Sequence, residues 1–185
     1  MRLCSALLFV VALAAFPVEA VADPQGDIAQ MAEAWSAVKS VHVDEKLSDG
    51  KTIGIDMIMP DKFHETLFNK MQVVIIGPDM WMNTGSKWMK MPMVMPQMKT
   101  WIEWAKKNGL TSGPKDYTIT DLGPSTIGTT PAEHYRMVNK TKNTTVETWI
   151  GKDHLPIQTY VPNGKESITI AYSKYNLIPD ITAPI

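Results

Sequence analysis

Methionine is the residue type whose number and spacing point most strongly to a chemical role in this sequence. The chain has 13 methionines, and seven of them lie between residues 80 and 98, in or beside a stretch that also holds Trp81, Trp88, Trp101 and Trp104. A thioether side chain is unbranched and polarizable, so it adapts to apolar partners of irregular shape. It is also a soft ligand that favours Cu(I). Three interpretations of this methionine-rich segment therefore compete.

The first interpretation is an apolar cavity that holds an acyl chain or another hydrophobic ligand, with the helix around Trp101 as its lid. Each buried methylene group contributes about 0.8 kcal/mol, so an acyl chain needs no charged contact to bind. A strand shifted by one residue exchanges its inward and outward side chains, so the facing depends on register. The residues expected to line the cavity are Met57, Met59, Trp81, Met89, Met91 and Trp101.

The second interpretation is a copper-binding protein. Met89, Met91 and Met93 alternate, so a strand would point their thioethers to one face, where they are the candidate copper ligands. Pro92 interrupts that strand, however, and no histidine accompanies the run. The third interpretation is a structural or interaction domain in which methionine simply fills the core.

Catalytic signatures are missing from the sequence. It contains no Gly-x-Ser-x-Gly, no His-Glu-x-x-His and no glycine-rich phosphate loop. The histidines are far apart in sequence, although His42 and His64 fall in adjacent expected hairpins. The single cysteine, Cys4, lies in a segment that we expect to be removed. We therefore expect a non-catalytic protein without a cofactor.

The N-terminal segment has the order of a secretory signal peptide. Arg2 precedes an apolar run over residues 6–16, and small residues follow it. The run is shorter than the roughly 20 residues that span a bilayer. We predict that residues 1–22 are the signal, with cleavage after Ala22 and a cut after Ala20 as the alternative.

Export predicts a periplasmic location for a single domain over residues 23–185. Cys4 precedes the apolar run, whereas an acylated cysteine would follow it, so no lipid anchor is expected. The chain has 18 basic and 19 acidic residues, a net charge of −1, which argues against nucleic-acid binding. The expected partners are a hydrophobic ligand or acyl chain and a membrane donor or acceptor protein, and the protein itself is expected to be a monomer.

Two helices and about ten strands are expected. Apolar residues at helical spacing predict a helix over 23–39 and a second helix over 96–108, and the tail over 176–185 is expected to be irregular or an edge. Short apolar runs separated by turn residues indicate an antiparallel meander. The fold class is therefore α+β, a large curved antiparallel sheet with helices on its concave face. After a first strand around Val41, the expected strands cover 53–59, 62–69, 71–76, 80–82, 87–91, 116–122, 132–138, 144–150, 156–161 and 166–175.

Several short motifs occur in the order found in one known superfamily. The segments over 59–64, 76–82, 129–135 and 149–156 resemble the strand joints of the periplasmic outer-membrane lipoprotein carriers and lipoprotein-sorting proteins. The resemblance implies a half-open β-barrel with helices over its concave face and a cavity for acyl chains or other lipids. The carriers hold their lid closed through a first-strand arginine, whereas the only arginine after Arg2 here lies at position 136. The resemblance therefore implies binding of some hydrophobic ligand as readily as lipoprotein shuttling.

Overall fold

The structure is a computed structural model that describes residues 23–92 and 114–185. The expectations that lie outside these residues are the signal peptide over 1–22, the end of the methionine-rich segment from Met93 on, the helix over 96–108, and Trp101. Within the described ranges, no helix is long and apolar enough to cross a membrane.

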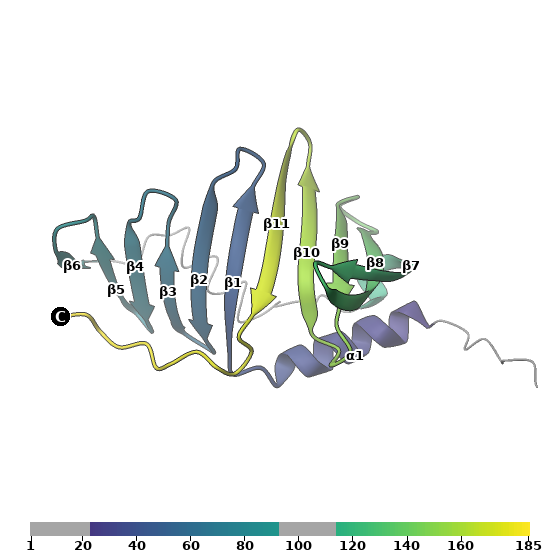
Figure 1. The fold of residues 1–185 in the computed structure, drawn as a ribbon, viewed down its shortest axis with the longest axis horizontal. Helices are drawn as coiled ribbons and strands as arrows, with labels where there is room; N and C mark the ends of the chain where they lie inside the picture. Colours follow the sequence, from purple (N-terminus) through teal and green to yellow (C-terminus); the bar gives the residue numbers. More distant parts are fainter. Residues whose placement is uncertain (1–22, 93–113) are drawn as a thin grey trace, which may run out of the picture.

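In the described part of the chain, eleven strands form one open antiparallel sheet, which confirms the expected curved, half-open fold (Figure 1). Strands β1 to β6 form one meander and β7 to β11 form another, and the pairing of β1 with β11 joins them. Among these strands, β6 and β7 are therefore the outermost. The strands are β1 (Ser40–Leu47), β2 (Thr52–Ile58), β3 (Lys62–Thr66), β4 (Gln72–Ile76), β5 (Asp79–Asn83), β6 (Trp88–Met91), β7 (Tyr117–Ile127), β8 (Thr130–Asn139), β9 (Thr145–Ile150), β10 (Pro156–Asn163) and β11 (Glu166–Ser173).

Helix α1 (Pro24–Ser36) covers one face of the sheet, which we call the inner face. Its N-terminus is capped by Asp23, whose side chain accepts a hydrogen bond from the Gly26 amide at 3.0 Å. Met31 is fully buried, and together with Ile28 it packs against strands β8 and β9. The helix is three residues shorter than predicted at its C-terminal end. A short 3₁₀ helix, η1 (Pro114–Asp116), precedes β7.

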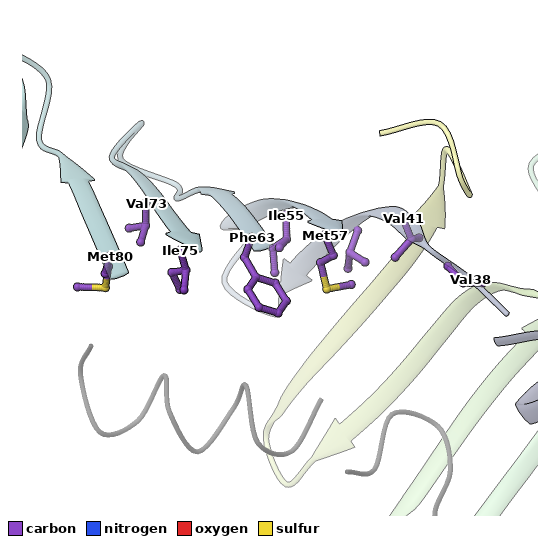
Figure 2. Packing of buried hydrophobic residues seen from close by; sticks show 9 residues of the cluster. Val38, Val41, Ile55, Met57, Phe63, Val73, Ile75 and Met80 are labelled. Carbon is purple, nitrogen blue, oxygen red and sulfur yellow. The ribbon is translucent and has the colours of Figure 1, made fainter. Parts of the chain in front are cut away.

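A row of apolar side chains crosses the inner face of the first meander. Residues paired directly across neighbouring strands form a continuous row, which consists of Val41, Met57, Phe63, Ile75, Met80 and Met91. Five of the six side chains are buried, and they point to the same side of the sheet (Figure 2). Alternation along each strand places all of these residues on the face that the structure uses as its main core.

The C-terminal tail lies on the opposite, outer face. As expected, it is irregular beyond β11. Ile181 is buried there against Val74 and Trp81, and the Lys62 ammonium lies 2.5 Å from the Asp180 carboxylate. The tail thus covers the apolar outer side of β4 and β5.

Strand β7 runs five residues further than the sequence predicted. The strand continues through a bulge between Asp121 and Gly123, where Gly123 has a φ of +85°. The sequence predicted an end of the strand before this glycine. Pro124 follows this bulge on β7, which is outermost among the described strands, and bulges and outermost strands are where a sheet accepts proline.

Candidate functional site

A pocket of about 580 Å³ opens in the second meander. It is built from the β7–β8 turn, the β9–β10 turn and the end of β11. Its volume lies within the range that binds small organic ligands. The lining residues are Thr129, Thr130, Pro131, Gly151, Lys152, Asp153, Leu155, Pro156, Ile157, Tyr172 and Tyr175.

Tyr172 and Tyr175 give the pocket an aromatic wall, and both rings pack against Trp35. Trp35 of α1 meets Tyr172 edge-on at a centroid distance of 5.6 Å and Tyr175 at 6.2 Å. The Tyr175 hydroxyl donates to the Pro156 carbonyl at 2.5 Å, which fixes the ring. Burial raises the pKa of Tyr172 to about 12, so its phenol is neutral at physiological pH. The aromatic wall is therefore uncharged.

The pocket continues into the apolar inner face. Tyr172 pairs with Val43 across the junction of β11 and β1, and Ile55 of β2 pairs with Val43 in turn. Tyr172, Tyr175 and Leu155 all pack against the core cluster of the first meander. A ligand in the pocket would thus meet the same surface that carries the methionines.

The structure brings four of the predicted site residues to the inner face. Met57 is buried in the core cluster, and Met59 and Met91 pack against it. Met89 pairs with Met82 on the same face and is 40% exposed. Two adjacent strands therefore place four thioethers side by side, as the pairs Met80–Met91 and Met82–Met89.

Trp81 lies on the outer face, away from these methionines. It is buried against Val74 and Ile181, because its neighbours Met80 and Met82 already point inward and side chains alternate along a strand. Trp81 and the methionines therefore do not share one surface. The sequence contained this signal, in the uninterrupted alternation of Met80-Trp81-Met82.

His42 and His64 lie on either side of Asp56, whereas His134 lies in the other half of the sheet. The His42 Nδ1 atom lies 2.6 Å from the Asp56 carboxylate on the outer face, and His64 pairs with Asp56 from the other side. His134 stacks on Trp149 at 4.1 Å, in the other half of the sheet. Among the described residues, no three His, Cys, Asp or Glu side chains are placed to hold a metal ion.

Two glutamates on the inner face were missed by the sequence analysis. Glu45 pairs with Ile53 of β2, and Glu65 pairs with Ile55 of the same strand. Burial raises the pKa of both carboxyls, and the charge of Glu45 raises the pKa of Glu65 further. Each glutamate occupies a position where alternation along its strand predicts an inward, apolar side chain. On β1, for example, Glu45 follows Val41 and Val43 on the same face.

The two raised pKa values predict an unusual pH dependence of stability. At pH values above the ordinary pKa of 4.5, the unfolded chain has released the protons of these carboxyls, whereas the folded protein still binds part of them. The stability of the fold therefore rises as the pH falls from neutral toward 4.5. Glu45→Gln/Glu65→Gln should be more stable than wild type at about pH 7, by a few tenths of a kcal/mol because both groups keep some solvent contact. Urea unfolding at about pH 7 and about pH 5 measures this difference.

The exposed Glu166→Gln variant is the control for that measurement. Its stability relative to wild type should not change between the two pH values. If the double variant is less stable than wild type at neutral pH, the charged carboxylates stabilise the fold, which would contradict the raised pKa values.

Comparisons with known proteins come from solved structures. No family model matches the sequence, and no curated protein matches it. The crystal structure of the lipoprotein LppX from Mycobacterium tuberculosis superposes with a TM-score of 0.65 and 16% identity, over 87% of this chain and 100% of that one. LprF from Mycobacterium bovis gives a TM-score of 0.66 and 13% identity, over 87% of this chain and 96% of that one.

A LolA-superfamily protein from Nitrosomonas europaea superposes less closely, with a TM-score of 0.34 and 10% identity over 82% of this chain and 92% of that one. At such identities the likeness concerns the fold alone. The superpositions on LppX and LprF, together with the open antiparallel sheet, confirm the expected fold. The chain shares the fold of the mycobacterial lipoproteins LppX and LprF.

Proposed function

We propose that the protein is a non-catalytic periplasmic carrier that binds a lipid, a lipidated protein or another hydrophobic ligand. The observation that supports this most is the 580 Å³ pocket with an uncharged aromatic wall, which continues into an apolar sheet face. Apolar burial alone supplies affinity, at about 0.8 kcal/mol per methylene group. Adaptable methionine side chains further along the same sheet face would accommodate chains of different shape.

The proposed binding surface extends from the pocket toward the methionines. Tyr172 and Tyr175 form its aromatic end. Of the residues expected from the sequence, Met57, Met59, Met89 and Met91 belong to its other end, and Trp101 remains the proposed lid residue. We also propose that the N-terminal segment directs export and that the protein is a monomer. A membrane protein would deliver the ligand or accept it.

A copper-binding role is the second candidate. It is favoured by the two methionine pairs, because Met80, Met82, Met89 and Met91 share one face of two adjacent strands. Thioethers are ligands that favour Cu(I). Met89 is 40% exposed, so at least one of these sulfur-bearing side chains is accessible from solvent.

Both candidates are tested by native mass spectrometry of the protein purified from its own cell envelope. Lipid extraction and metal analysis are carried out on the same sample. We expect one apolar molecule per chain and no copper. Protein that carries copper and no lipid would contradict the carrier proposal and favour the methionine pairs, and protein that carries neither would favour a structural domain.

A further inference from the structure

Five hairpin turns gather at one end of the sheet. Strands β1, β3, β5, β8 and β10 run in the same direction, because the sheet is antiparallel throughout. The turns that follow them therefore lie at the same end, away from the C-terminal tail (Figure 1). We call these turns the basic rim; they comprise residues 48–51, 67–71, 84–87, 140–144 and 164–165.

The charge of the basic rim differs from that of the rest of the protein. Every one of its turns carries at least one lysine, and the six are Lys51, Lys70, Lys87, Lys140, Lys142 and Lys165. Its one acidic residue, Asp49, lies 2.5 Å from the Lys51 ammonium. The rim therefore has a net charge of +5 in a chain whose net charge is −1. The hairpin turns at the opposite end carry one lysine and two aspartates.

An exposed aromatic side chain lies among these lysines. Phe68, in the β3–β4 turn, is 54% exposed, and the Lys51 ammonium lies 5.1 Å from its ring centroid. Among the described residues it is the one large apolar side chain that is exposed in the rim. Exposed aromatic residues beside lysines are typical of surfaces that sit at the headgroup level of a membrane.

We propose that the basic rim docks the protein on an anionic lipid bilayer. The lysines are spread over five turns along one end of the sheet, so they fit an extended plane of phosphate groups rather than a single ligand. Lysines that face an anionic membrane are attracted to it, and Phe68 would enter the interface between them. This role goes beyond the proposed carrier function, because it needs no ligand on the inner face.

The test is co-sedimentation of the full chain, in the form that the expression host produces, with vesicles of phosphatidylcholine containing about 30% phosphatidylglycerol. Lys70→Gln/Lys165→Gln is the rim variant. Lys39→Gln/Lys174→Gln is its matched control, since each pair removes two exposed charges and contains one residue with positive φ, 62° at Lys70 and 52° at Lys174. Any contribution of residues 1–22 is common to all variants.

We expect the rim variant to bind at least tenfold more weakly than wild type, because each lysine contributes roughly a fivefold factor. The control variant should bind as wild type does, and raising the salt from about 0.1 M to about 0.5 M should release the wild-type protein. Phe68→Ser should also weaken binding. The proposal is wrong if wild type ignores anionic vesicles, or if rim and control variants lose affinity equally; absence of vesicle binding would point to an acidic protein partner instead.

Vesicle docking and ligand loading separate in this design. The rim variant should still purify with the same bound molecule as wild type, since none of its changes touches the pocket or the inner face. Wild-type protein that docks on anionic vesicles but purifies without a bound lipid would contradict the carrier proposal and leave the docking proposal intact.

Discussion

Replacing Phe63 with alanine is expected to lower the free energy of unfolding by about 3–5 kcal/mol. The side chain is fully buried on the inner face, where it pairs with Met57 of β2 and Ile75 of β4 (Figure 2). Both neighbours are fixed in the sheet, so the cavity left by the ring cannot collapse completely. Urea unfolding of the full chain, followed by circular dichroism, measures the change.

Phe68→Ala is the matched control for this prediction. The same ring is removed five residues further along the chain, from a side chain that is 54% exposed. Its expected effect on stability is within about 0.5 kcal/mol, because little buried contact is lost. Similar losses in both variants would contradict the assignment of Phe63 to the core.

Local alternation carried most of the fold prediction. The repeat of apolar residues over 53–59 assigned Met57 and Met59 to one face before the partner strands were known, and Phe63 follows after a two-residue turn. The strands were recognisable because turn residues bound each run. Chemical similarity alone predicts that Trp81 lies with the methionines, whereas strict alternation puts it on the other face, where the structure has it.

The pocket depends on contacts that alternation does not encode. Trp35 meets Tyr172 and Tyr175 because β11 pairs with β1, which brings residues more than 130 positions apart into contact. A sequence shows where strands begin and end, but their order in a sheet depends on long-range pairing. Glu45 was overlooked for a related reason, since its apolar neighbours on β2 and β11 are fixed by register alone.

A tryptophan at the pocket should exclude an apolar ligand without unfolding the protein. Thr130 lines the pocket at the start of β8 and is exposed, so Thr130→Trp adds a ring without disturbing the core. We expect the affinity for the neutral probe N-phenyl-1-naphthylamine to fall at least tenfold. Displacing the equivalent of two methylene contacts removes about 1.6 kcal/mol. Fluorescence titration of the purified protein gives the affinity.

The comparison variant is Thr120→Trp, which adds the same ring to an exposed position of β7 opposite Arg136, outside the pocket lining. It should bind the probe as wild type does, and both variants should unfold at the wild-type urea concentration. If Thr130→Trp binds the probe unchanged, the ligand lies elsewhere on the inner face. Because the two variants differ only in where the ring stands, a loss confined to Thr130→Trp assigns probe binding to the pocket beside Tyr172 and Tyr175.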